Sequence, residues 1–254
     1  MNLMSSDLGY WLEQLKKRPI ENSMAIFDIT FEYPKNLKVY SKEDGLVLIW
    51  QRSKIPYIML IGDDDIVLGI LKKEILPEHK QIFFVLLNES FKNMVIKNLE
   101  VEKVTKLDLY YLDKNNFKPF NEIQAIRLNK NFSDGIRNQL ELSKELKDQT
   151  FFSERLEKGI FYGIIIDDRL VSFIGSIAEL ESTITMGMFF TNPDFRRQHY
   201  GLSCASHLTK TILESNRMPL CYVEVDNEPS IRIWERLGYS KRPENYYFIG
   251  VKSR

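Results

Sequence analysis

A basic turn precedes a helical pattern in the stretch 193-PDFRRQHYGLSCASHL-208. An apolar run ends just before the turn, and residues 202–213 follow it with apolar side chains on one helical face. A strand that leads through a turn into a helix leaves unpaired backbone N–H groups at the positive end of the helix, which favours an anion. Arg196 and Arg197 add charge suited to a phosphate or pyrophosphate, and Gly201 would let the backbone approach a ligand closely. The same residues also fit a solvated basic turn after an edge strand.

Two motifs resemble those of a known superfamily. Arg-Arg-Gln-His-Tyr-Gly at 196–201 resembles the acetyl-CoA motif Gln/Arg-x-x-Gly-x-Gly/Ala of the GNAT acyltransferases, and 193-PDF-195 resembles the Pro-acidic-aromatic segment that usually precedes it. Further on, 226-DNEPSIRIWERLGY-239 resembles the second motif, Asn-x-x-Ala/Ser-x-x-x-Tyr-x-x-x-Gly-Phe/Tyr. Upstream, residues 161–175 are similar to the second and third strands of that fold. The resemblance spans 123–254 and implies the acyl-CoA N-acyltransferase fold.

The resemblance implies acetyl-CoA as co-substrate and a role for each matching position. The last residues of the strand before the turn would pair with the pantetheine arm as an added strand does. The amides of Arg197 to Leu202 would bind the pyrophosphate, and residues of the second motif would lie near the pantetheine. The implied cofactor-binding residues are Met188, Phe189, Phe190, Thr191, Arg196, Arg197, Gln198, His199, Tyr200, Gly201, Leu202, Asn227, Ser230 and Trp234.

His199 departs from the first motif, because it occupies the position of the first motif glycine. If this position requires a positive φ, a histidine there costs about 1 kcal/mol or more. If the turn is already helical at this residue, no penalty arises. The imidazole then points outward or, when protonated, reaches a phosphate. We do not expect His199 to be a catalytic base.

Trp234 departs from the second motif, where a tyrosine usually protonates the departing CoA thiolate. An indole N–H can donate a hydrogen bond to sulfur, but it does not give up its proton. Three outcomes remain open. The thiolate leaves unassisted, since the thiol pKa is about 8.5; a water or the hydroxyl of Tyr200 or Tyr239 replaces the acid; or the domain binds CoA without fast transfer.

Acyl transfer to an amine needs a neutral nucleophile, so a carboxylate is expected near the position of the thioester. Glu224 ends a predicted strand just before Asn227 and is our first candidate for the base. Glu179 and Glu181 are further candidates, near the end of another strand. Each of these carboxylates also fits an ordinary solvated surface residue. The catalytic residues that we predict are Glu224, Trp234 and Tyr239.

These motifs leave three hypotheses about function. The first is an N-acetyltransferase that moves an acetyl group directly from acetyl-CoA to a primary amine of a small molecule or amino acid. The second is a catalytically weakened CoA-binding or acyl-CoA-binding sensor or partner-binding module. The third is a scaffold whose basic turn binds phosphate incidentally. Acceptor-dependent release of CoA discriminates the first from the second, and tight binding of CoA would exclude the third.

Composition restricts the partners and the cellular compartment that we expect for this protein. The 254 residues have a formal net charge of +0, which argues against an electrostatic nucleic-acid binder. The two cysteines, Cys204 and Cys221, are too few for a disulfide framework and fit a reducing cytoplasm. The histidines and cysteines show no metal-ligand spacing. No apolar run reaches the roughly 18 residues of a membrane span, and the amino terminus lacks a signal-peptide pattern. We expect a cytoplasmic monomer or homodimer with no membrane partner.

The second half of the chain must position the motif residues. Periodicity and turn signals predict a mixed α/β layer with a largely antiparallel central sheet flanked by helices. Asp167-Asp168 lies between two apolar runs, which predicts a hairpin. Asn227 is placed to cap a helix over 227–238, and Gly238 to end it. The other elements predicted here are strands at 123–128, 183–190, 219–225 and 245–251, and helices at 133–146, where Ser133 is a cap, and 202–213.

The first half lacks both motifs. Helices are predicted at Asp7 to Lys17, 64–76 and 89–100, and strands at 45–51, 57–62, 82–87 and 107–112. The polar stretch 113–122 is the best linker candidate, which predicts an accessory domain at 1–118 and a GNAT acyltransferase domain at 119–254. The first could be a degenerate copy of the same fold that shapes the acceptor pocket, as in the branch resembling glycine N-acyltransferase. The segment 86-LLNESFKNM-94 has no arginine turn and no glycine, so we expect no cofactor there.

Overall fold

The computed structural model describes residues 5–50, 55–132 and 149–252. The helix predicted at 133–146, with its cap Ser133, lies outside the described residues. Internal contacts divide the chain into two compact units. Unit 1 comprises Met1–Asp108 and Pro243–Arg254, and unit 2 comprises Leu109–Arg242. The final strand thus belongs with unit 1, whereas the prediction assigned all of 119–254 to one domain. The functional division into accessory and acyltransferase domains stays a prediction.

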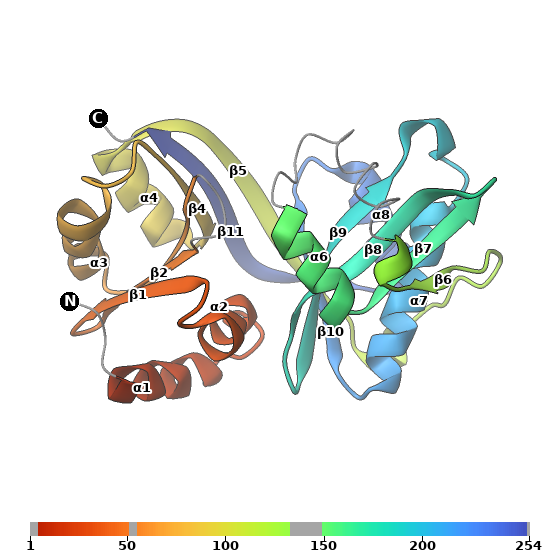
Figure 1. Cartoon of the computed structure of the whole chain (residues 1–254), viewed down its shortest axis with the longest axis horizontal. Helices are drawn as coiled ribbons and strands as arrows, with labels where there is room; N and C mark the ends of the chain where they lie inside the picture. Colours follow the sequence, from red (N-terminus) through yellow and green to blue (C-terminus); the bar gives the residue numbers. More distant parts are fainter. Residues whose placement is uncertain (1–4, 51–54, 133–148, 253–254) are drawn as a thin grey trace. The chain divides into compact units, whose positions relative to one another are not determined.

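Unit 1 is a mixed sheet with helices (Figure 1). Its elements are α1 (Ser5–Lys16), α2 (Ser23–Phe27), β1 (Leu37–Lys42), β2 (Gly45–Trp50), β3 (Tyr57–Gly62), α3 (Asp64–Ile70), β4 (Gln81–Leu87), α4 (Glu89–Asn98), most of β5 (Glu100–Tyr111) and most of β11 (Ser240–Lys252). Helix α2 continues as a π-helical segment, Asp28–Glu32, and α3 continues as another, Leu71–Ile75. The strands β1-β2-β3-β4-β11 are neighbours in that order. All pairs are antiparallel except β3 and β4, which are parallel.

Unit 2 has a similar order of elements. They are β6 (Ile126–Leu128), α6 (Gln149–Lys158), β7 (Phe161–Ile166), β8 (Arg169–Glu179), β9 (Thr183–Thr191), α7 (Tyr200–Glu214), β10 (Met218–Glu224) and α8 (Glu228–Leu237), with 3-10 turns at Lys114–Asn116, Lys130–Phe132 and Pro193–Phe195. The strands β10-β9-β8-β7-β6 are neighbours, and only β9 and β10 pair in parallel. The predicted mixed α/β class with a largely antiparallel sheet is confirmed.

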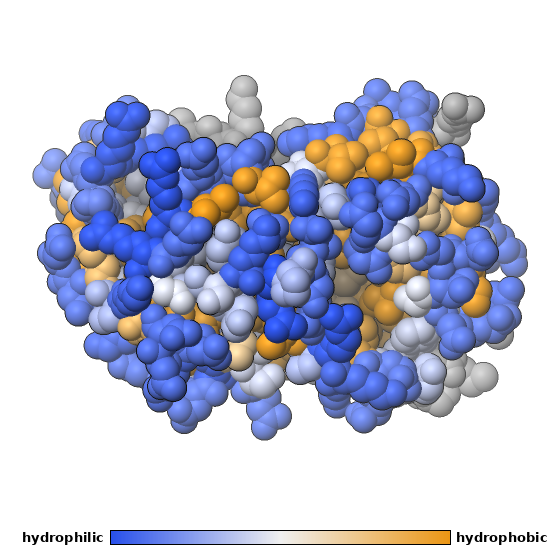
Figure 2. Space-filling model, turned by 180° about the vertical axis from the view of Figure 1, so that it is seen from behind, coloured by the Kyte–Doolittle hydropathy of each residue, from blue (hydrophilic) through white to orange (hydrophobic). Residues whose placement is uncertain are grey.

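Apolar side chains fill both faces of the unit 2 sheet. One core packs α7 and α8 against the strands, and it includes Leu208, Trp234 and Leu237. A smaller core on the other face joins Leu156 of α6 to Phe161 and Phe173 of the strands. Figure 1 shows α6 and α7 on opposite faces of this sheet. On the view of the surface in Figure 2, hydrophilic residues predominate and hydrophobic ones gather in separate patches.

Local signals in unit 2 act as predicted. Asp167 and Asp168 adopt positive φ values of 48° and 59° and connect β7 to β8, which confirms the hairpin. The Asn227 side chain accepts a hydrogen bond from the Ser230 N–H and caps α8, and Gly238 ends that helix in the left-handed conformation. The predictions missed β1, α2 and α6 and gave β5 too few residues, since β5 begins at Glu100.

The polar stretch predicted as a linker is packed against the helices of unit 2. We call residues 113–125 the strap. Phe120 is buried, and its N–H donates to Ser206 Oγ of α7 at 2.9 Å. The N–H of Lys118 donates to the carbonyl of Leu237 in α8 at 3.0 Å. The linker interpretation was wrong because Phe120 finds its apolar and polar partners far away in the sequence.

The assignment of β11 to unit 1 predicts which unit a substitution in that strand destabilises. Ile249 is fully buried in the core of unit 1, so Ile249→Ala should lower its free energy of unfolding by about 2–5 kcal/mol. The exposed Lys252→Ala on the same strand is the control and should change it by less than about 1 kcal/mol. Native-state hydrogen exchange should show faster opening at β4 and unchanged opening at β8. Equal acceleration in both strands would contradict the division into units.

Candidate functional site

The turn before α7 has a left-handed backbone. His199 is the N-cap residue with φ 61° and ψ 10°, and Arg197 also has a positive φ of 64°. This settles the alternatives at His199: the position requires a positive φ, and the histidine bears the conformational cost. The imidazole is exposed and lies against Phe120 of the strap, with 5.7 Å between ring centroids.

The first turn of α7 presents backbone N–H groups. The first bond of the helix runs from the Ser203 N–H to the His199 carbonyl at 2.9 Å. The amides of Tyr200, Gly201 and Leu202 therefore have no acceptor within the helix. Residues Arg196 to His199 beside them are exposed, whereas Gly201 and Leu202 are buried. An anion would therefore approach this helix end from the side of the turn.

Side-chain contacts join the turn to the end of β9. The Nε of Arg196 donates to the Thr191 carbonyl at 3.1 Å, which ties the turn to the last residue of the strand. Thr191 Oγ1 and Ser172 Oγ lie 2.9 Å apart, and Ser172 also donates to the Phe190 carbonyl at 3.1 Å. Arg196 thus fixes the turn with one edge of its guanidinium.

Gly201 allows α7 to lie close to the sheet. A Cβ at this position would approach Thr191 Oγ1 to 3.0 Å and the ring of Phe189 to 3.2 Å. Its missing side chain therefore faces strand β9. The sequence argument gave this glycine a role in ligand approach, and the structure gives it a packing role that places the amides of the first turn at the strand end.

Strands β9 and β10 diverge beside this turn. Their parallel register pairs Thr183–Met186 with Met218–Cys221. In the described part of the chain no pairing between the two strands continues beyond Met186 and Cys221. The last residues of β9, Gly187 to Thr191, are half-buried, and Met188 has a positive φ of 50°. The divergence leaves main-chain groups of β9 free on the β10 side, where an extended ligand can add as a strand.

Trp234 is buried at this divergence. Its ring lies 5.7 Å from Phe189 of β9 and 5.0 Å from Tyr239, the latter edge-on. The indole N–H donates to Ser230 Oγ at 3.0 Å. Trp234 and Ser230, which both belong to the second motif, are therefore hydrogen-bonded to each other, and the indole N–H has an acceptor within the protein.

The Tyr239 hydroxyl lies in the core. It forms a 2.7 Å hydrogen bond with Thr209 Oγ1 of α7 and a 3.9 Å contact with the Met186 sulfur. Burial raises the pKa of Tyr239 well above its usual value of 10. A phenol that binds its proton so tightly is a poor donor to a thiolate, so this geometry favours packing over proton donation. Tyr200, the other candidate hydroxyl, donates to Gln198 Oε1 at 3.0 Å in the turn.

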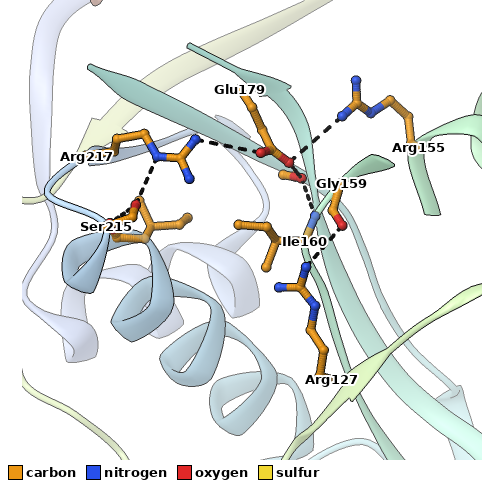
Figure 3. Close-up of polar contacts among 9 residues, drawn as sticks. Arg127, Arg155, Gly159, Ile160, Glu179, Ser215 and Arg217 are labelled. Atoms are coloured by element: carbon orange, nitrogen blue, oxygen red, sulfur yellow. Dashed lines mark hydrogen bonds and ion pairs between the residues drawn. The ribbon is translucent and has the colours of Figure 1, made fainter. Parts of the chain in front are cut away.

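The candidate carboxylates lie in different places. Glu224 is exposed at the end of β10, on the face opposite to buried Cys221 and Val223. Glu179 lies at the far end of β8, between Arg155 and Arg217 at 3.9 Å and 3.7 Å, and Ser176 donates to it at 2.5 Å (Figure 3).

Arg217 follows the carboxy-terminal end of α7, so Glu179 lies a helix length away from the turn before α7. Its ion pairs give it a structural role. Glu181 is exposed in the turn between β8 and β9, at that same end.

Sequence patterns missed three residues near the turn. Lys118 and Phe120 of the strap and Arg236 of α8 line a hollow beside His199. The only signal was an aromatic residue at 120 within a polar stretch. The described residues contain no group of three or more histidine, cysteine or acidic side chains that could bind a metal ion. Within the same ranges, no helix combines the length and hydrophobicity that crossing a bilayer requires.

The part of the chain that contains this site resembles known proteins. Residues 161–249, which include β9, the turn, α7, β10 and α8, match the sequence model of the family described as FR47-like protein. A putative acetyltransferase of the GNAT family from Novosphingobium aromaticivorans superposes with a TM-score of 0.66 at 15% identity, over 94% of this chain and 99% of that one. The chain has the GNAT fold. No curated protein matches its sequence.

Two further structures superpose on nearly the whole chain. A tandem GNAT protein from the clavulanic acid biosynthesis pathway is 11% identical, with a TM-score of 0.67 over 97% of this chain and 95% of that one. A Drosophila protein is 13% identical, with a TM-score of 0.74 over 99% and 97% of the two chains. At these identities the likeness concerns the fold alone.

The left-handed conformation at His199 predicts a stability difference between two variants. His199→Ala and His199→Gly both remove the contact with Phe120, and only alanine retains a Cβ. Urea unfolding should therefore find the glycine variant more stable than the alanine variant by about 1 kcal/mol. The same pair at exposed Lys210 in α7 should give the opposite order, because glycine weakens a helix interior by about 1 kcal/mol. An alanine variant as stable as the glycine variant at 199 would contradict the left-handed turn.

Proposed function

We propose that the protein is an N-acetyltransferase that moves an acetyl group from acetyl-CoA to a primary amine of a small molecule or amino acid by direct transfer. The observation that carries the proposal is the unsatisfied first turn of α7, which lies where β9 and β10 diverge. The GNAT fold and the match at 161–249 support it. Buried thiols at Cys204 and Cys221 are consistent with a cytoplasmic location.

Acetyl-CoA fits the groups present at this site. The amides of Tyr200, Gly201 and Leu202 would bind the pyrophosphate, with Arg197 adding positive charge at the exposed side. The main chain from Met188 to Thr191 would pair with the pantetheine arm. Bound acetyl-CoA supplies the thioester whose acyl carbon is attacked. We expect Gln198 and His199 to contribute mainly through the turn that they form.

The reaction exchanges one bond at the acyl carbon. The amine nitrogen forms a bond to that carbon, the carbon–sulfur bond breaks, and the amine loses a proton. Glu224 is the proposed acceptor of this proton, directly or through a water, because it is exposed at the end of β10. A main-chain N–H of β9 beside the divergence is the proposed donor to the oxyanion. The sulfur leaves as a thiolate and takes its proton from solvent.

Trp234 supports this site through packing. Its N–H is bonded to Ser230, and an indole does not release its proton. We therefore assign it no acid role. Tyr239 contacts Trp234 from the core and acts as a positioning residue in this proposal.

Unit 1 is proposed to be a degenerate copy of the same fold. The succession β1-β2-β3-α3-β4-α4-β5 parallels β7-β8-β9-α7-β10-α8-β11, and in both units the parallel pair flanks the first of the two helices. The α3 helix begins differently, because the Asp63 carboxylate accepts from the amides of Asp65 and Ile66 at 3.0 Å and 3.1 Å. The Asp63 carboxylate occupies this helix end and repels an anion, so we expect no CoA at unit 1. Its role in shaping the acceptor pocket stays a prediction.

One observation favours a second candidate function. Neither Trp234 nor Tyr239 is a good acid, since Trp234 is an indole and the Tyr239 hydroxyl is buried. A protein of this kind could bind acyl-CoA and report its presence without fast transfer. Turnover distinguishes this sensor from the enzyme.

Acceptor-dependent release of CoA from acetyl-CoA tests the proposal, with a panel of amines and amino acids as acceptors. We expect release with at least one acceptor. Trp234→Phe should keep kcat within about threefold, because the indole donates no proton. Trp234→Tyr adds an acid, and a higher kcat there would mean that thiolate departure limits turnover. Arg197→Gln should weaken acetyl-CoA binding, whereas the control Lys210→Gln, at the other end of α7, should not.

Three results would count against parts of the proposal. Calorimetric binding of acetyl-CoA without release for any acceptor would favour the sensor. A kcat lowered more than about tenfold in a folded Trp234→Phe variant would give the indole N–H a catalytic role. Absence of acetyl-CoA binding would leave the incidental scaffold.

A further inference from the structure

A hollow of about 520 Å³ lies beside the cofactor turn. It is lined by Lys118, Pro119, Phe120, Asn121, Glu122 and Arg236. The Phe120 ring also contacts the ring of His199, the N-cap residue of α7, at 5.7 Å. The hollow therefore borders the turn proposed to bind pyrophosphate, and its volume lies within the range of small-molecule sites.

The chemistry of the lining favours an anion that carries an aromatic ring. Lys118 and Arg236 are exposed cations, against one carboxylate from Glu122. The guanidinium carbon of Arg236 lies 5.1 Å from the centre of the Phe120 ring. A guanidinium stacked on an aromatic face keeps its edge donors available for a phosphate, and its other face can stack on a base. The residue thus offers both kinds of contact.

The strap is fixed in place before any ligand binds. The N–H of Phe120 is bonded to Ser206, and that of Lys118 to the carbonyl of Leu237. Lys118 and Phe120 also lie outside the residues 161–249 that match the FR47-like family. Most of the hollow is therefore built by a segment that neither motif includes, on a backbone anchored to both α7 and α8, and Arg236 of the second motif completes it.

We propose that Lys118, Phe120 and Arg236 form a subsite for the 3′-phosphorylated nucleotide end of CoA. This inference rests on the proposed function, since it concerns the same ligand. The two cations would bind the 3′-phosphate, and Arg236, supported by Phe120, would stack on the adenine. Free inorganic phosphate could satisfy the charges of the two cations but not the stacking surface. Because the two cations would bind the 3′-phosphate, the subsite discriminates CoA from a ligand that lacks this phosphate.

Calorimetric titrations with CoA and with 3′-dephospho-CoA test the subsite in the full chain. The wild type should bind CoA about tenfold more tightly than 3′-dephospho-CoA, since charge-assisted contacts to the phosphate are lost in the latter. Lys118→Gln and Arg236→Gln should each reduce this preference to about threefold, and the double variant should abolish it. Binding of 3′-dephospho-CoA should change little in Lys118→Gln. Added salt should reduce the preference of the wild type.

Matched controls come from the same two elements. Lys114→Gln changes another exposed lysine of the strap, and Arg232→Gln changes an exposed arginine of α8 that pairs with Glu228 at 2.7 Å. Both should keep the full preference. Equal binding of the two ligands by the wild type would overturn the subsite and leave the proposed function standing. Binding of neither ligand would overturn both. Inorganic phosphate binding as tightly as CoA would overturn the nucleotide assignment.

Discussion

The amides at the start of α7 need an acceptor that the protein does not supply within the helix. A helix N-terminus is commonly satisfied by a side chain of its own cap, as Asp63 does for α3 in unit 1. At α7 the N-cap residue is His199, which makes no side-chain cap hydrogen bond. The positive end of this 15-residue helix thus has no cap from its own N-cap side chain. The two helices of one chain therefore begin differently, one capped by a carboxylate and the other without a side-chain cap.

Several features keep the open helix end in place. The left-handed turn at Arg197 and His199 reverses the chain within a few residues, and Arg196 ties that turn to the end of β9. Gly201 lets the helix lie against Thr191 and Phe189. The conformational cost at His199 is about 1 kcal/mol, which is small against the burial of α7 in the core of unit 2. Helix packing therefore stabilises a turn that the sequence of the turn does not favour.

The same packing accounts for the rest of the site. Helix α8 places Trp234 against Phe189, so an aromatic group fills the core side where β9 and β10 diverge. The strap crosses α7 and α8 and brings a lysine and an aromatic ring next to the turn. Exposed cations and the uncapped start of α7 thus lie together at one end of unit 2. Glu179 is held by two arginines at the other end.

The sequence predicted those features that depend on a few adjacent residues. The Asp167-Asp168 hairpin, the Asn227 cap and the Gly238 helix end follow from local conformational preferences, and the structure confirms each. The GNAT fold followed from two motifs with ordered spacing. These signals were sufficient to place β9, α7, β10 and α8 in order.

Features that depend on distant contacts could not be predicted. Phe120 is bonded to a residue 86 positions away, so its stretch looked like a linker. The ion pairs of Glu179 come from Arg155 and Arg217, and no spacing rule connects them. The sequence left two conformations open at His199, and the structure shows the one with a positive φ. The role of Gly201 likewise depends on which side of the helix faces β9.

The central claim is that the amides at the start of α7 bind the pyrophosphate of acetyl-CoA. Hydrogen exchange at single amides, measured by NMR with and without acetyl-CoA, tests it most directly. Exchange should slow at Tyr200, Gly201 and Leu202 and stay unchanged at Asp65 and Ile66, whose amides Asp63 already binds. Unchanged exchange at α7 under saturating acetyl-CoA, or equal slowing at α3, would contradict the account.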